Sequence, residues 1–208
     1  MTPQDPISLA GWRRTVAETY AAIRQMAPTD PDRAWRTFRS ARDTLFRTHP
    51  QTPLTPDQRA RFVGLSYYPY DPAWRLTGRL NREIDPATFT LDFPTDGRFL
   101  YTRIAQVSFS AGGQPACLSL FWIEGYGGGL FLPFTDATSG QETYGGGRYL
   151  FDTIKGADLG MTETDVVLDL NYAYNPSCAY DARWVCPLSP PENSLMFPVR
   201  AGEKLYPG

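Results

Sequence analysis

The spacing of apolar residues changes sharply near residue 50, and this change constrains the fold more than any other feature of the sequence. Before it, apolar residues recur every three or four positions, which is the period of an amphipathic α-helix. After it, short β-branched and aromatic runs alternate with Pro, Gly and Asp, as in strands joined by tight turns. The sequence therefore predicts a helical part over residues 1–50 and a β-rich part over residues 57–208.

The helical part is predicted to be a hairpin of two helices. The first covers residues 7–27 and is ended by Pro28, because proline cannot continue a helix. Thr29 or Asp30 is suited to cap the second helix, and Pro31 fits its first turn. The apolar stripes of the two helices consist of Leu9, Trp12, Val16, Tyr20 and Ile23, and of Trp35, Phe38, Leu45 and Phe46.

The β-rich part is predicted to contain eight or nine short strands. Candidate runs lie at residues 62–68, 74–80, 87–93, 98–110, 115–124, 129–134, 147–152 and 165–170. The sequence AGGQ at 111–114 is a hairpin turn. We therefore predict an α+β protein, mainly β, in which the helical hairpin packs on an antiparallel β-sandwich or partly closed β-barrel, with residues 1–208 in a single domain.

Alternation within two of these runs predicts which side chains face the core. In the first run Arg103 interrupts an otherwise apolar face. The predicted core face consists of Phe99, Tyr101, Ala105, Val107 and Phe109 in run 98–110, and of Leu118, Leu120 and Trp122 in run 115–124.

Composition excludes several classes of function. The net charge of −2 gives no general attraction to nucleic acid or to an anionic membrane. No apolar run is long enough for a signal peptide or a membrane span, so we expect a cytoplasmic protein. Residues 1–61 are locally basic, which indicates either a solvated helical face or a surface that docks an acidic partner.

Several long motifs resemble one known family. These are FLPFTDATSGQETYGGGRYL, LDLNYAYNPSCAYDARWVCPLSPPEN and the closing VRAGE, with HPQTPL and FVGLSYYP earlier in the chain. They resemble domain-of-unknown-function family 1684, which occurs in bacteria and archaea, and the similarity covers about residues 10–204. The resemblance implies that the motif residues belong to one site, and it names no reaction.

The stretch from Asn171 to Asn193 is unusually rich in Pro, Asn, Tyr and Cys. Its prolines stiffen the backbone, and its asparagines can bond neighbouring turns. One interpretation is a rigid connection that seals the open end of the sheet. The other is the rim of a pocket, with Asn171, Tyr174, Tyr180 and Glu192 lining its mouth.

A triple glycine precedes Arg148, and Lys155 follows seven residues later. Glycines allow close approach of a backbone or a ligand, and arginine binds carboxylate or phosphate through two parallel hydrogen bonds. The motif therefore indicates an anion clamp, or else an arginine paired with an acid such as Asp136 or Glu142. The predicted ligand-binding residues are Arg148, Tyr149, Lys155, Asn171, Tyr174, Asn175 and Tyr180.

The three cysteines and the single histidine allow a different chemistry. Cys117 lies in an apolar strand and is expected to be a buried thiol. Cys178 and Cys186 are separated by seven residues, which is not a zinc-knuckle spacing. They could be packing thiols, a reversible disulfide, or ligands of a metal ion together with His49. We expect no cofactor.

Three functions are consistent with these features. The favoured hypothesis is a binding protein for a small anionic molecule, with the Asn171–Asn193 stretch as the rim of the pocket. The second is a hydrolase or redox enzyme that uses His49, Cys178 and Glu192 as catalytic residues, with or without a metal ion. The third is a non-catalytic interaction scaffold that works through the basic helical hairpin. The oligomeric state stays open.

Overall fold

The computed structural model describes residues 5–93 and 97–207. Its first two helices are α1 (Pro6–Met26) and α2 (Pro31–Thr48). The side chain of Asp5 accepts a hydrogen bond from the backbone N–H of Ile7, and Asp30 accepts one from Arg33, both at 3.0 Å. These caps satisfy backbone groups that a helix start leaves unpaired. The predicted hairpin and its Asp30 cap are confirmed.

One short helix, α3 (Pro56–Ala60), follows the hairpin. Thr55 and Gln58 form a reciprocal capping box at its start. After it the chain enters the sheet. The strands are β1 (Arg75–Asn81), β2 (Ala87–Phe93), β3 (Gly97–Ala111), β4 (Gln114–Ile123), β5 (Gly129–Phe134), β6 (Arg148–Asp152) and β7 (Asp165–Asp169).

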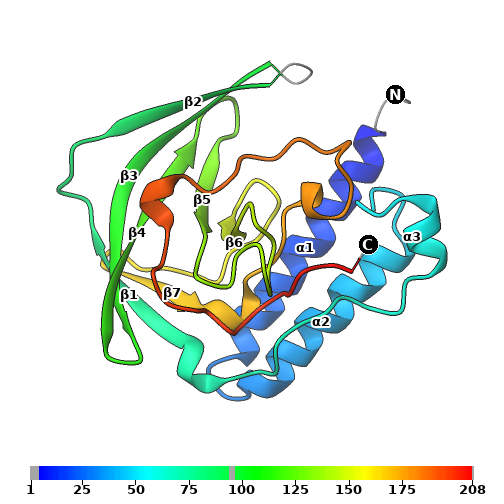
Figure 1. The fold of residues 1–208 in the computed structure, drawn as a ribbon, viewed down its shortest axis with the longest axis horizontal. Helices are drawn as coiled ribbons and strands as arrows, with labels where there is room; N and C mark the ends of the chain where they lie inside the picture. Colours follow the sequence, from blue (N-terminus) through cyan, green and yellow to red (C-terminus); the bar gives the residue numbers. More distant parts are fainter. Residues whose placement is uncertain (1–4, 94–96, 208) are drawn as a thin grey trace.

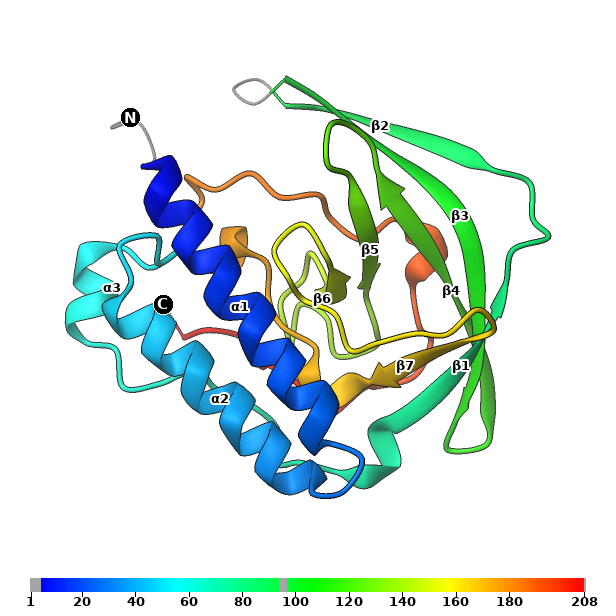
Figure 2. The same cartoon turned by 180° about the vertical axis from the view of Figure 1, so that it is seen from behind.

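The seven strands form one antiparallel sheet in the order β6-β5-β4-β3-β1-β7, and β2 pairs with the first half of β3. The sheet is curled into a half-barrel. Figures 1 and 2 show α1 and α2 lying side by side against its open side, opposite β2, β3 and β4. The predicted fold class, a helical hairpin packed on a partly closed antiparallel barrel, is confirmed.

A β-bulge alters the predicted core face. The register between β3 and β4 shifts between Arg103 and Ala105, so that one extra residue is inserted in β3. As a result Phe121 is buried, and Trp122, which simple alternation placed inside, is 39% exposed. Arg103, the exception on the apolar face, bonds Glu192 and the carbonyl of Asp85.

The prediction of a strand at residues 62–68 was wrong. This segment has one isolated bridge, between Tyr67 and Glu203. The backbone N–H of Tyr68 donates to the carbonyl of Gly202 at 3.0 Å. Its aromatic residues fill the space between the helices and the end of the chain, so their burial, not a ladder of hydrogen bonds, explains the pattern.

The core is continuous between the helices and the sheet. Tyr20, Ile23 and Phe38 from the hairpin belong to the same buried cluster as Val107 and Leu168 from the sheet. A second cluster contains Phe46 of α2, Tyr180, and Leu54, Phe62 and Leu65 from the segments on either side of α3. No helix of the described residues is long and apolar enough to cross a membrane.

The segment after β7 occupies the opening between the sheet and the helices (Figure 1). It contains three single turns of 3-10 helix, at Leu170–Tyr172, Ser177–Ala179 and Pro191–Asn193. Tyr174 pairs with Tyr149 on β6, and Ser194 bridges to Thr135. These contacts place the predicted functional stretch in the interface between the two parts of the chain.

Candidate functional site

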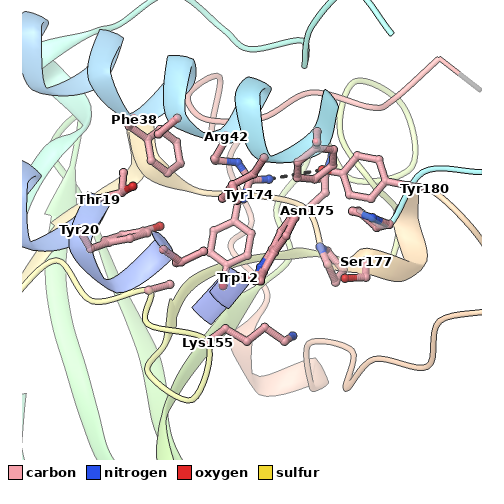
Figure 3. A pocket seen from close by; sticks show the side chains of 17 residues that line it. Trp12, Thr19, Tyr20, Phe38, Arg42, Lys155, Tyr174, Asn175, Ser177 and Tyr180 are labelled. Carbon is pink, nitrogen blue, oxygen red and sulfur yellow. Dashed lines mark hydrogen bonds between the residues drawn. The ribbon is translucent and has the colours of Figure 1, made fainter. Parts of the chain in front are cut away.

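A small cavity lies where α1 and α2 meet the segment 174–180 (Figure 3). Trp12, Phe38 and Phe46 belong to its apolar wall. About 50 Å³ of it is open to water-sized molecules. A volume of that size holds a few water molecules or a small organic group. The cavity is therefore a candidate binding site.

Arg42 of α2 lies at one wall of the cavity. Its Nη2 donates to Glu203 Oε2 at 2.8 Å, and its Nε donates to the Tyr67 hydroxyl at 2.8 Å. The guanidinium carbon lies 4.8 Å from the ring centroid of Tyr174. Arg42 and Tyr174 line the cavity, whereas the paired carboxylate of Glu203 does not.

Glu203 is buried and holds the lining segment in place. Its Oε2 accepts a hydrogen bond from the backbone N–H of Asn175 at 3.0 Å, and its Oε1 accepts one from the Tyr180 hydroxyl. Burial raises the pKa of Glu203, and the charge of Arg42 opposes that shift. The Asn175 side chain also donates to the carbonyl of Lys204 at 2.9 Å. One carboxylate thus connects α2 with the segment 174–180.

Two buried polar atoms of the cavity lining have no hydrogen-bond partner within the described chain. They are the hydroxyl of Tyr20 and the side-chain oxygen of Asn175, both on residues that are 2% exposed. In Figure 3 the Tyr20 hydroxyl points into the cavity. Burial raises the pKa of Tyr20, so the hydroxyl stays protonated and can donate. Buried polar groups in native proteins nearly always have a partner, which here would be water or a ligand.

Lys155 supplies the second cation of the lining. It follows β6, and its ammonium lies 3.0 Å from the Asp152 carboxylate and 5.8 Å from the ring centroid of Tyr149. The Lys155 side chain is 40% exposed, so it lies where solvent can reach it. Asp152 does not line the cavity. The two charged residues of the lining, Arg42 and Lys155, are therefore both cations.

Four of the seven predicted ligand-binding residues meet in this cavity: Lys155, Tyr174, Asn175 and Tyr180. Tyr149 lies behind them, and its backbone exchanges hydrogen bonds with Tyr174 at 2.9 and 3.0 Å. The Tyr149 hydroxyl donates to the carbonyl of Pro187.

Asn171 lies elsewhere and has a structural environment. Its side chain exchanges two hydrogen bonds with the backbone of Asp71, at 3.0 and 2.9 Å, and also donates to Asp169. Asn193, at the other end of the stretch, bonds both backbone groups of Ser119 and the carbonyl of Pro133. The stretch is thus anchored at both ends by buried amides.

Arg148 does not reach the cavity. Its side chain is 1% exposed, and its Nη2 donates to Asp136 at 2.8 Å and to the carbonyl of Val199 at 3.0 Å. Its Nη1 donates to the carbonyls of Ala201 and Glu203. An external anion would have to displace Asp136. The geometry is that of the alternative interpretation, an arginine paired with an acid, and we leave Arg148 out of the candidate site.

The predicted catalytic residues lie in three different environments. His49 ends α2, accepts a hydrogen bond from the backbone of Gln51 at 3.1 Å and packs edge-on against Trp12. Partial burial and the charge of Arg59 lower the pKa of His49. Glu192 lies 3.5 Å from Arg103 of β3. Neither contacts Cys178, so the structure does not bring these three residues together.

Cys178 and Cys186 are neighbours, and both are thiols. The backbone N–H of Cys178 donates to the Cys186 sulfur at 3.4 Å. Cys117, expected to be buried, is exposed on β4. Within residues 5–93 and 97–207, no three His, Cys, Asp or Glu side chains gather in a way that could hold a metal ion.

Sequence reasoning missed Arg42, Tyr20 and Glu203. Arg42 lies four residues after Phe38 and four before Phe46, so it interrupts the apolar stripe of α2. A single charge within an apolar stripe was the available signal. Tyr20 was assigned to the core, and nothing in its spacing reveals that its hydroxyl has no partner. Glu203 belongs to the closing motif VRAGE but was given no role.

Fold and site together define a half-barrel of antiparallel strands, closed by a helical hairpin, with a small cationic cavity at the interface. A family model described as "Protein of unknown function (DUF1684)" matches residues 60–204, and the chain belongs to this family. The match begins after the hairpin, so Arg42, Tyr20 and Trp12 lie outside it.

A solved structure supports the assignment. The chain is 32% identical to an uncharacterised protein of Haloarcula marismortui whose solution NMR structure is known. The similarity covers 84% of this chain and 94% of that chain, with a TM-score of 0.61. No curated protein matches the chain.

Proposed function

We propose that the protein binds a small organic anion in the cavity between the helical hairpin and the segment 174–180. The observation that carries this proposal is the composition of the lining. Among the described residues, two cations, Arg42 and Lys155, and two polar atoms without a hydrogen-bond partner, on Tyr20 and Asn175, belong to one cavity whose wall is mainly apolar.

The charges favour an anion. The carboxylates that pair with Arg42 and Lys155 lie outside the lining. The charged side chains that border the cavity are therefore both positive. Among the described residues, the hydrogen bonds of Arg42 come from its Nε and Nη2 atoms, and none comes from Nη1. A carboxylate or phosphate group would accept hydrogen bonds from Arg42 and from the Tyr20 hydroxyl, and charge-assisted bonds of this kind are the stronger ones.

The apolar wall favours an organic body. Trp12, Phe38 and Phe46 offer faces and edges of rings, and Val16 and Leu45 complete the wall. Burying apolar surface contributes about 25 cal/mol per Å². A ligand with a short aliphatic chain and a single acidic group matches both the wall and the small volume.

Titration of the protein with sodium propionate, followed by backbone amide NMR, tests the proposal. Propionamide is the neutral control of the same shape. We expect propionate to shift the amides of residues 174–180, and propionamide to bind at least about tenfold more weakly, because it lacks the charge that the two cations stabilise. Equal binding of both compounds would remove the anion from the proposal, and no binding of propionate would contradict it.

Two variants separate the cavity from the rest of the surface. Lys155→Met should weaken propionate binding about tenfold, while Lys204→Met, which changes the only other lysine of the chain, should leave it unchanged. Lys204 lies outside the lining, and its ammonium lies over the Tyr68 ring. Equal losses in both variants would indicate non-specific attraction.

The other two hypotheses receive less support. Catalysis by His49, Cys178 and Glu192 required these residues to converge, and their contacts lie in separate places. A scaffold needs a broad apolar surface on the helices. Among the described residues of α1 and α2, the one large apolar side chain in the exposed class is Ile7. Binding of a small anion is the function that the geometry supports best.

A further inference from the structure

A second groove, on the other side of the segment 174–186, contains both loop cysteines. Cys178 and Cys186 line it together with Tyr144, Trp184 and Phe89. It is distinct from the cavity described above, which contains no cysteine. The proposed ligand does not use these thiols, so their proximity calls for a separate explanation.

A backbone hydrogen bond holds the two cysteines next to each other. The backbone N–H of Cys178 donates to the Cys186 sulfur at 3.4 Å. The Tyr144 hydroxyl donates to the Cys178 sulfur at 3.5 Å. Cys186 is 8% exposed and Cys178 is half-buried, and both border the groove.

The surroundings make the two thiols unequal. Hydrogen bonding from Cys178, whose backbone N–H donates to the Cys186 sulfur, stabilises a negative sulfur at Cys186, and the charge of Lys155 adds to it. Together these outweigh burial and lower the pKa of Cys186. The same pairing and burial raise the pKa of Cys178. A thiolate is the nucleophile in thiol chemistry, so Cys186 is the group that reacts first.

We propose that Cys178 and Cys186 form a redox-active pair that exchanges with low-molecular-weight disulfides in this groove. The Cys186 thiolate attacks one sulfur of the disulfide RSSR, forming a Cys186–SR bond and releasing RS⁻. The Cys178 thiol then gives its proton to RS⁻ and attacks the Cys186 sulfur. A Cys178–Cys186 bond forms and a second RS⁻ leaves. The chain is oxidised by two electrons, and RSSR is reduced to RSH and RS⁻.

Cys117 provides an internal comparison. It is exposed on β4, and the Ser108 hydroxyl donates to its sulfur at 3.9 Å. Its environment has no second thiol, so exchange there ends at a mixed disulfide. Pairing, and not exposure, therefore distinguishes the proposed site from an ordinary surface thiol.

The test is incubation of the full chain carrying Cys117→Ser with oxidised glutathione, followed by intact mass and peptide mapping. We expect the chain to lose two hydrogens without keeping glutathione, and a peptide linking Cys178 to Cys186 to appear. Adding Cys178→Ser should trap one glutathione on Cys186, because the resolving thiol is then absent. Adding Cys186→Ser should leave Cys178 largely unmodified.

Three results would overturn the proposal. The first is a chain that keeps both thiols under conditions that modify Cys117 in the unmutated protein. The second is stable glutathione on both Cys178 and Cys186 without a link between them. The third is trapping on Cys178 instead of Cys186, which would reverse the order of the steps. The peptide map of the unmutated chain answers the first two questions even where a serine variant fails to fold.

Discussion

Among the described residues, two arginine–carboxylate pairs lie in the interior, and they differ in what surrounds them. Arg148 and Asp136 have side chains that are 1% and 0% exposed, and the other partners of Arg148 are backbone carbonyls. Arg42 and Glu203 are 13% and 1% exposed, and the other partners of Arg42 are tyrosine hydroxyls. Arg148 is enclosed by its own chain, whereas Arg42 borders a cavity.

A glycine with positive φ precedes one member of each pair. Gly147 has a φ of 90°, and a Cβ there would lie 2.6 Å from the carbonyl oxygen of Phe134. Gly202 has a φ of 77°, and a Cβ there would lie 2.6 Å from the carbonyl oxygen of Ala173. Only glycine allows both the conformation and the close approach. Each glycine thus brings a charged residue into the interior. The two pairs differ in the groups that the charged residues contact there.

The largest expected effect is on the enclosed pair. Arg148→Met leaves the Asp136 carboxylate and three carbonyls buried without their donor, and we expect a loss of about 3 to 5 kcal/mol in the free energy of unfolding. Urea denaturation measures it. Arg24→Met, which removes an exposed pair with Asp158, is the control and should cost less than about 1 kcal/mol. Equal losses in the two variants would show that enclosure does not matter.

Arg42→Met should lower the free energy of unfolding less than Arg148→Met does at low pH. At neutral pH the two losses should become similar. Burial already raises the pKa of Glu203, and removing Arg42 raises it further. A carboxyl with a raised folded-state pKa loses stability as pH rises from its unfolded pKa towards the folded one. The loss in Arg42→Met, measured by urea denaturation, should therefore be larger at pH 7 than at pH 5. Adding Glu203→Gln should reduce that difference, and a pH-independent loss would contradict the argument.

Asp169 extends the comparison to a buried carboxylate without a close cation. Arg75 lies 4.0 Å away, and one Asp169 oxygen has no partner in the described chain. Burial raises the pKa of Asp169 to about 6 from 3.8. The unfolded chain releases this proton at lower pH than the folded chain does. The contribution of Asp169 to the free energy of unfolding therefore decreases as pH rises between those two values, and it stays low at higher pH.

Asp169→Asn should remove the loss of stability that the ionised Asp169 causes as pH rises. At pH 8 the variant should be more stable than the unmutated protein by up to roughly 3 kcal/mol, and near pH 4 the two should converge. Asp165→Asn, on the same strand and exposed, is the control and should show no such trend. Urea midpoints across pH measure both variants. A constant difference between pH 4 and pH 8 would show that the Asp169 carboxylate is already satisfied.

The same comparison shows how far the sequence could lead. Helix caps and strand alternation are local, so Asp30 and most strands were predicted correctly. The bulge at Ile104 and the turn-like segment 62–68 depend on partners distant in the chain, and local pattern failed there. The glycines before Arg148 indicated a close approach of the chain to a backbone or a ligand, but the sequence could not say whether Arg148 pairs with an acid or with a ligand. Arg42 belonged to no motif and was marked only as a single charge in the apolar stripe of α2, so its contact with the segment 174–180 emerged only from the packing.

The smallest expected effect concerns Lys155, which lies between the cavity and the thiol pair. Its charge favours the Cys186 thiolate, so Lys155→Met should raise the pKa of Cys186 and slow its alkylation. We expect iodoacetamide to react with Cys186 about two- to threefold more slowly at pH 6, measured by peptide mass mapping, with Cys117 unaffected. Lys204→Met should leave both rates unchanged. If Lys155→Met weakens propionate binding without changing the alkylation rate of Cys186, the lysine serves the cavity alone. If it slows the alkylation of Cys186 without changing propionate binding, the cation that matters in the cavity is Arg42.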